Sequence, residues 1–171
     1  ERAGGNPLFL TELLRAVAAP STDARTDAPR AVPSSLRVAV MARLASLTQA
    51  ERRLLSLASL LGTRFSVDEL AHVADRPVLA VVDDLHAALA QGVLREEGHE
   101  LAFSHALVGD CIRDDQPVAF RNAVHRHIAG VLAGRGASAQ RVAEHYVLAA
   151  TGETELLVDE EAATWLARAS A

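Results

Sequence analysis

The sequence of 171 residues contains no lysine, because all 17 of its basic residues are arginine. A phosphate-binding loop of the form GxxxxGK[ST] requires a lysine ammonium, and Schiff-base catalysis requires a lysine amine. Both kinds of site are therefore excluded from this chain. Cysteine is nearly absent as well. The single Cys111 excludes an internal disulfide framework and every zinc motif built on several cysteines.

Long apolar runs and targeting signals are also missing from the sequence. No stretch approaches the roughly 18 uncharged apolar residues of a membrane-spanning helix. Residues 1–7 lack the basic, apolar and cleavage regions of a signal peptide. From these absences we expect a cytoplasmic chain that does not engage a membrane.

The residues that are present indicate a globular, mainly α chain. Half of them are apolar (50%), 23% are charged, and 34 are alanine, the residue with the lowest helix cost. The net charge of −5 makes the chain a poor general binder of nucleic acid, since phosphate attraction needs clustered cations.

Residues 1–47 are predicted to form a helical lid segment. Asn6 suits an N-cap, and Pro7 suits the first position of a helix that ends before the next proline. Residues 19–33 hold three of the prolines and are expected to form an exposed, mobile loop. Ser34 or its neighbour then caps a second helix, whose apolar stripe comprises Leu36, Val40, Leu44 and Leu47.

Residues 48–115 are predicted to form a winged-helix domain. Thr48 and Glu51 make a capping box, and Ser66 caps the next helix. The period then changes from helical to alternating over 93–103, which indicates a β-hairpin around a Glu-Gly turn. The expected helices are 49–61, 67–75 and 77–90, with Leu79, Val82, Leu85 and Leu89 facing inward in the last of them.

Residues 116–171 are predicted to form antiparallel helical pairs that resemble the start of a tetratricopeptide-like array. Such repeats bury their faces against neighbours, so we expect the array to continue beyond this chain. A helix at 104–113 (Ala106, Leu107, Cys111 and Ile112 inward) is expected to end the preceding domain. The helices of the array are expected at 118–133 (Phe120, Val124, Ile128, Val131 and Leu132 inward), 138–150 and from about Val158.

The charge of the predicted winged helix argues against DNA recognition. Residues 48–103 contain five arginines and nine acidic residues. Helix 77–90, at the position of a recognition helix, carries Asp83 and Asp84 and no arginine. Carboxylates repel phosphates, so a packing or regulatory role is favoured over DNA binding.

Four segments together resemble a known family. They are Gly-Asn-Pro-Leu-Phe-Leu-Thr-Glu-Leu-Leu (5–14), Val-Pro-Ser-Ser-Leu-Arg (32–37), Glu-Arg-Arg-Leu-Leu-Ser-Leu-Ala-Ser-Leu-Leu-Gly (51–62) and Leu-Ala-Phe-Ser-His-Ala-Leu-Val (101–108). In this order they look like the middle of the large ATP-binding transcriptional regulators of the LuxR type, which belong to the STAND class of signal-transduction ATPases.

The resemblance implies a regulatory segment rather than a complete machine. An ATPase core that binds ATP or ADP would precede Glu1, and a DNA-binding domain would follow Ala171. The expected partners are that core and the helical repeats of the same protein, with DNA bound only through the missing domain and self-association possible. No cofactor, metal or enzymatic activity is expected of this segment itself. The alternatives are a protein-interaction scaffold without a nucleotide role, a DNA-binding winged helix and, last, a hydrolase.

The resemblance also implies nucleotide-binding residues. Asn6 and Pro7 match a glycine-x-proline motif whose proline packs near the adenine, although they also serve as a helix cap. His105 matches a histidine that approaches the ADP β-phosphate, although it could instead cap helix 104–113. Two positions depart from the family pattern: Ser104 replaces an arginine, and Gly109 replaces a basic residue.

The remaining candidate residues have plain structural interpretations. His125 and His127 lie two apart on a helix and point in different directions, so we expect these two and His145 to be packed or solvated rather than metal ligands. Cys111 is expected to be a buried, inert thiol, and Trp165 an anchor between repeats. The pair Arg52 and Arg53 is expected at the solvated surface.

Overall fold

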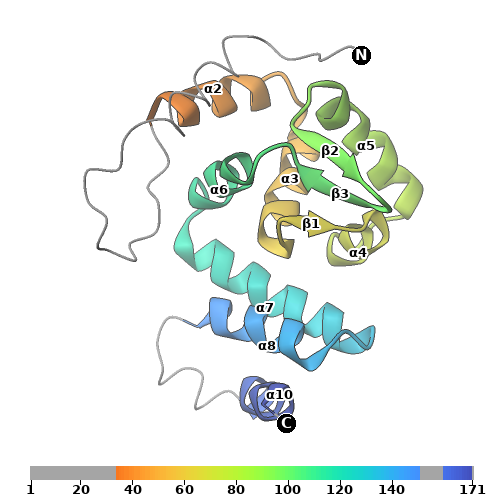
Figure 1. Ribbon diagram of the computed structural model, residues 1–171, viewed down its shortest axis with the longest axis vertical. Helices are drawn as coiled ribbons and strands as arrows, with labels where there is room; N and C mark the ends of the chain where they lie inside the picture. Colours follow the sequence, from red (N-terminus) through yellow and green to blue (C-terminus); the bar gives the residue numbers. More distant parts are fainter. Residues whose placement is uncertain (1–33, 151–159, 171) are drawn as a thin grey trace.

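The computed structural model describes residues 34–150 and 160–170 (Figure 1). These residues form eight helices and one three-stranded sheet, which confirms the mainly α class. Asn6, Pro7, the first predicted helix and the predicted loop at 19–33 lie outside the described residues.

Helix α3 (Gln49–Leu61) is the central element of the first half. Thr48 accepts a hydrogen bond from the Glu51 amide and the Glu51 carboxylate accepts one from the Thr48 amide, so the predicted capping box is confirmed. Gly62 ends the helix with φ +147°, a value that a residue with a Cβ rarely adopts. Helix α2 (Ser34–Leu44) precedes α3 and packs against α6 (Ala106–Asp114).

The sheet has strand order β1-β3-β2 and is antiparallel throughout. The hairpin of β2 (Leu94–Glu97) and β3 (Glu100–Phe103) lies where the alternating pattern predicts it. The short extended piece β1 (Arg64–Phe65) adds a third strand, with Phe65 opposite Leu101. The order of helix, strand, two helices and hairpin is that of a winged helix.

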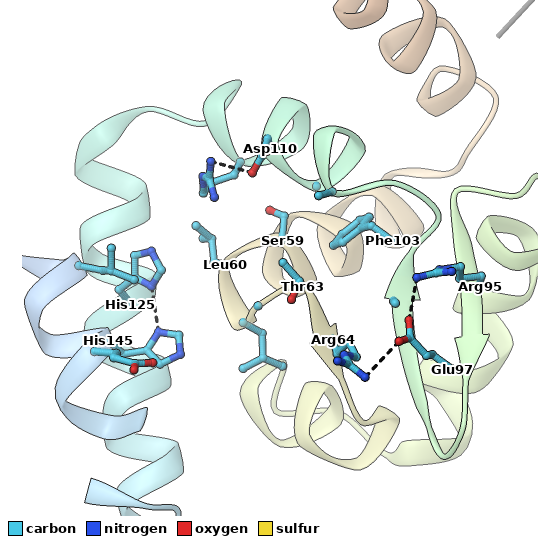
Figure 2. Close-up of a pocket in the computed structure, with 18 residues that line it drawn as sticks. Ser59, Leu60, Thr63, Arg64, Arg95, Glu97, Phe103, Asp110, His125 and His145 are labelled. Carbon is cyan, nitrogen blue, oxygen red and sulfur yellow. Dashed lines mark hydrogen bonds and ion pairs between the residues drawn. The ribbon is translucent and has the colours of Figure 1, made fainter. Parts of the chain in front are cut away.

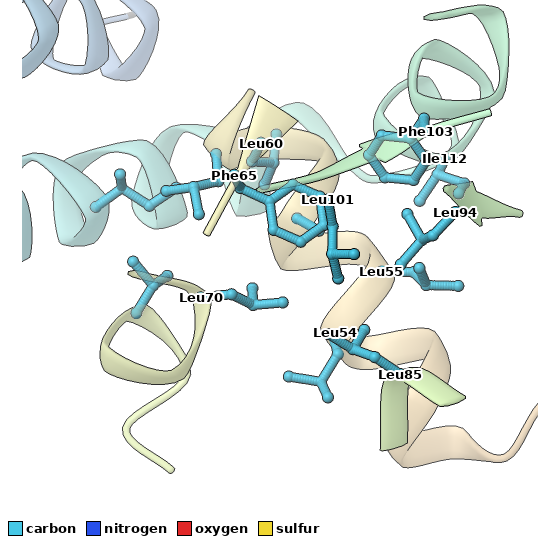
Figure 3. Close-up of a cluster of buried hydrophobic side chains, with 14 of the residues drawn as sticks. Leu54, Leu55, Leu60, Phe65, Leu70, Leu85, Leu94, Leu101, Phe103 and Ile112 are labelled. Carbon is cyan, nitrogen blue, oxygen red and sulfur yellow. The ribbon is translucent and has the colours of Figure 1, made fainter. Parts of the chain in front are cut away.

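Helices α4 (Val67–Val73) and α5 (Val78–Ala90) complete the winged helix around an apolar core. In Figure 3 the side chains of α3, α4, α5 and the sheet converge on this core. Phe65 is fully buried, and its ring centroid lies 6.2 Å from that of Phe103. The largest core side chains include Leu54, Leu55, Phe65, Leu70, Leu85 and Leu94.

The predicted inward face of α5 is partly wrong. Its buried residues are Val81, Leu85 and Ala88, whereas Leu79 is 79% exposed. The helix is apolar on nearly every side, so its sequence contains more than one stripe at helical spacing. Packing against α3 and α4 selects the stripe that is buried.

The second half of the fold consists of helices only. Helix α7 (Val118–Gly134) is joined to α8 (Ala139–Ala149) by a short turn, so the two run antiparallel, and α10 (Glu160–Ala169) packs on α8 (Figure 1).

The predicted inward position of Phe120 is wrong, because this ring is 66% exposed in the first turn of α7. Likewise, Ala106 is exposed at the start of α6. The inner face of α7 is formed by His125, Ile128, Ala129 and Leu132.

Polar contacts join α4 of the winged helix to α7 and α8. The Arg135 guanidinium contacts the Asp68 carboxylate at 2.6 Å, and Arg141 contacts Glu69 at 2.9 Å. In addition, His127 Nε2 lies 2.9 Å from the carbonyl oxygen of Val73, the last residue of α4. These contacts hold one helix of the winged helix against both helices of the pair.

Across the two described stretches, the helices are too short or too polar to traverse a lipid bilayer.

Candidate functional site

His105, the phosphate-sensing residue implied by the resemblance, is the exposed N-cap residue of α6. Its side chain makes no capping hydrogen bond, so it does not cap the helix through its ring. Desolvation by the surrounding protein and the positive charge of Arg95 lower the pKa of His105. The imidazole is therefore mainly neutral at neutral pH. The structure does not test its predicted partnership with Asn6 and Pro7, which lie outside the described residues.

The two departures from the family pattern beside His105 have local structural reasons. The Ser104 hydroxyl donates to the Gly92 carbonyl at 2.7 Å and so ties the end of β3 to the chain entering β2. Gly109 lies against Phe103, and a Cβ at this position would come within 2.9 Å of the ring. A basic side chain at 109 would therefore displace the core ring of Phe103.

The structure brings together two histidines that the sequence does not pair. His125 of α7 and His145 of α8 are each 5% exposed, and their Nδ1 atoms lie 3.0 Å apart. His127, in contrast, is exposed and contacts α4. His125 and His145 are thus packed in the interior, and His127 is solvated. Within the described ranges, no three histidine, cysteine or acidic side chains are grouped as metal ligands.

The spacing of each histidine from its buried neighbours along the helix indicates that both rings face inward. His125 lies three residues before Ile128 and four before Ala129, both buried. His145 follows the buried Val142 by three residues and precedes the buried Ala149 by four. Both imidazoles therefore belong to inward faces. Their contact depends on the register of α7 against α8, which periodicity does not supply.

The histidine pair is neutral near pH 7. Burial, and secondarily the charges of Arg113 and Arg121, lower the pKa of His125 to about 4. Burial, followed by His125 and Arg141, lowers the pKa of His145 to about 4. In a contact between two neutral rings, one Nδ1 must carry the proton and the other must accept it.

A cleft of about 500 Å³ opens beside this pair, between the winged helix and the helices α7 and α8 (Figure 2). The histidines lie on one side of the cleft and Arg64, Arg95 and Glu97 on the other. Helix α6 contributes Gly109, Asp110 and Arg113, the end of α3 contributes Ser59, Leu60 and Leu61, and α8 adds Glu144 and Leu148.

The charged side chains of the cleft are partly paired. Glu97 accepts from two arginines, with Arg64 at 3.1 Å and Arg95 at 2.8 Å. Arg113 contacts Asp110 at 2.9 Å and also reaches Asp114. Two guanidinium groups on one carboxylate leave a surplus positive charge at the sheet wall. This polar cleft is the site that sequence reasoning missed.

Three further predictions can be compared with the structure. Cys111 is 1% exposed, so its predicted burial is confirmed, and burial raises its pKa to about 11, which disfavours the reactive thiolate. Trp165 is half-buried on α10 and lines a hollow with Tyr146 of α8, as expected of an anchor between helices. Arg52 and Arg53 are exposed, as expected, and the Arg52 guanidinium also donates to the carbonyl oxygens of Leu44 and Leu47 and so caps the end of α2.

No protein-family model matches the chain, and no curated protein or solved structure shows a significant match to it. The resemblance to LuxR-type regulators therefore remains a prediction that rests on the four sequence segments.

Proposed function

We propose that this chain is a regulatory middle segment of an ATP-dependent transcriptional regulator of the LuxR type. It would couple the nucleotide state of an N-terminal ATPase core to a helical sensor array and to a C-terminal DNA-binding domain. Asn6, Pro7 and His105 would contact ATP or ADP held by that core, and the protein would act in the cytoplasm.

The proposal rests on the four sequence segments, and the structural observation that best supports it is the junction between α4 and the pair α7 and α8. Arg135 and Arg141 reach Asp68 and Glu69, which are consecutive residues on α4. Coupling between distant sites is often carried by packed elements joined by polar contacts, and these ion pairs, with the His127 contact to Val73, place α4 against both helices. A displacement of the winged helix would thus be transmitted to the repeats.

The pairing of the arginines supports a role other than DNA reading for this winged helix. Arg76 contacts Asp84 on α5 at 2.6 Å, so its charge is compensated. Arg64 of β1 and Arg95 of β2 line the cleft beside α7 and α8 instead of joining α5, and Asp83 lies exposed on α5. A DNA-reading surface would instead present unpaired cations to the phosphates.

The test has two steps. First, the gene sequence upstream of Glu1 is expected to encode a GxxxxGK[ST] loop. Second, in the longer protein, His105→Ala is expected to speed ADP release and raise basal activity. His99→Ala, which alters an exposed histidine at the turn of the wing, serves as the control. An upstream sequence without the loop, or equal ADP release in both variants, would refute the proposal.

A protein-interaction module without a nucleotide role is the second candidate, favoured by exposed apolar side chains. Val118 and Phe120 project from the start of α7 at 57% and 66% exposure. Val147 and Leu148 are exposed on α8. Binding of a partner protein in the absence of nucleotide, lost in Phe120→Ser, would favour this candidate.

A further inference from the structure

The cleft beside the histidine pair contains hydrogen-bonding atoms that the protein itself does not use. His125 and His145 contact each other through Nδ1, and neither Nε2 atom has a partner among the described residues. No side-chain nitrogen or oxygen in those residues is both fully buried and unpartnered. Each Nε2 atom therefore retains some exposed surface, although each residue is only 5% exposed, and both residues line the cleft.

The tautomers of the pair determine what these atoms offer. The ring that donates through Nδ1 has a lone pair at Nε2, and the ring that accepts at Nδ1 carries a proton at Nε2. The neutral pair thus presents one donor and one acceptor. Such a combination suits a neutral polar group, such as an amide or a hydroxyl.

The opposite wall provides charge instead. Arg64 and Arg95 share the single carboxylate of Glu97, and their side chains are 58% and 57% exposed. They therefore retain donors for a further acceptor. Arginine forms its strongest hydrogen bonds with carboxylate and phosphate oxygens. This wall, with its surplus positive charge, suits an oxyanion.

We propose that this cleft binds a small organic molecule with an oxyanion at one end and a neutral polar group at the other. The oxyanion, a carboxylate or a phosphate, contacts Arg64 and Arg95. The polar group hydrogen-bonds to Nε2 of His125 or His145. A cleft of about 500 Å³ is of the size that encloses small-molecule ligands. The proposal goes beyond the regulatory function above and requires no ATPase core.

The first experiment tests the oxyanion end by nuclear magnetic resonance. Inorganic phosphate and acetate are titrated separately at constant ionic strength. Saturable shifts are expected at the amides of Thr63, Arg64 and Glu97. The variant Arg64→Gln/Arg95→Gln is expected to weaken binding at least fivefold, whereas Arg53→Gln, an exposed arginine of α3 outside the cleft, leaves it unchanged. The tighter of the two anions identifies the class of oxyanion.

The second experiment tests the histidine end. N-acetylglycine, which carries a carboxylate and an amide, is expected to bind at least fivefold more tightly than acetate and to shift the Nε2 resonance of His125 or His145. In His145→Gln this gain is expected to disappear. The wild-type comparison of the two probes holds even if that variant does not fold.

Two results would overturn the proposal. One is the absence of a saturable response to both phosphate and acetate in the wild-type protein. The other is a response that the double arginine variant leaves intact. Neither result bears on the LuxR-type function, whose test is the upstream sequence and ADP release.

Discussion

The winged helix and the pair α7 and α8 are stabilised in different ways. The winged helix buries large aliphatic side chains around Phe65 and Phe103, whose rings contact each other. The pair also buries apolar side chains, among them Ile128 and Val142, but places two histidines in its interior. The first region depends mainly on apolar burial, and the second depends also on polar contacts with its neighbour.

This difference indicates where the molecule responds to its surroundings. An apolar core contributes stability that changes little with pH or salt. Buried histidines and surface ion pairs respond to both. The helical pair and its junction with α4 are therefore expected to be the sensitive region, and the winged helix the stable reference.

The largest expected effect concerns the winged-helix core. Phe65→Ala removes a fully buried ring and is expected to lower the free energy of unfolding by about 3–5 kcal/mol. Phe120→Ala, which truncates an exposed ring of the helical pair, is the matched control and should change it by less than about 0.5 kcal/mol. Urea denaturation measures both. Similar losses in the two variants would contradict the assignment of Phe65 to the core and Phe120 to the surface.

Acid should destabilise the helical pair. The folded pKa of His125 and that of His145 are about 4, below the ordinary value of 6.5, so the unfolded chain takes up protons first as the pH falls. The stabilisation is complete above about pH 6.5 and is lost as the pH approaches 4. One histidine whose pKa falls from 6.5 to about 4 accounts for about 3 kcal/mol of the free energy of unfolding. Because the two rings contact each other, their contributions do not simply add, and the expected total loss is about 3 kcal/mol.

Unfolding measured across this pH range tests the effect. The double variant His125→Leu/His145→Leu removes both polar partners and should flatten the pH dependence, while His99→Gln should retain it. A wild-type profile that is already flat between pH 7 and pH 4 would show that the pair does not control acid stability.

Gly109 and Gly130 differ in how much space surrounds them, so replacing each with alanine should affect stability differently. Gly109→Ala would place a Cβ 2.9 Å from the Phe103 ring and should cost about 1–3 kcal/mol. Gly130→Ala on α7 meets no atom within 4 Å and should be neutral or stabilising by up to about 1 kcal/mol. Thermal unfolding of the two variants gives the comparison, and equal shifts in Tm would refute it.

The smallest expected effect lies at the junction of the two regions. A double-mutant cycle with Glu69→Gln and Arg141→Gln should give a coupling energy of about 0.5 kcal/mol, because the Arg141 side chain is 38% exposed. This coupling should decrease in high salt. Arg53→Gln is the control for loss of an exposed arginine. A coupling energy of zero at low salt would show that the ion pair between Glu69 and Arg141 does not stabilise the contact between α4 and α8.

Local signals predicted much of the fold. The Thr48 capping box, the Ser66 cap and the change of period at the hairpin each act within a few residues, so the sequence contains them directly. The burial of Cys111 followed from its apolar neighbours. The winged-helix order was predicted by placing these elements in sequence.

Tertiary choices were not predictable in the same way. The apolar residues of α5 allow several buried faces, and only packing decides against Leu79. Phe120 belongs to an apolar stripe, but no described helix covers the first turn of α7 closely enough to bury its ring. The contact of His125 with His145 joins residues 20 apart on two helices, and the cleft requires the winged helix to be docked beside them.

The inert thiol of Cys111 has a practical consequence for labelling studies. Because it is the only cysteine of the sequence, a maleimide dye or nitroxide added to the folded protein would react at an introduced surface cysteine alone. Cysteines placed at the exposed positions Asp83 and Ala123 would carry one probe on α5 and one on α7. The distance between the probes would then report any separation of the wing-bearing region from the helical pair.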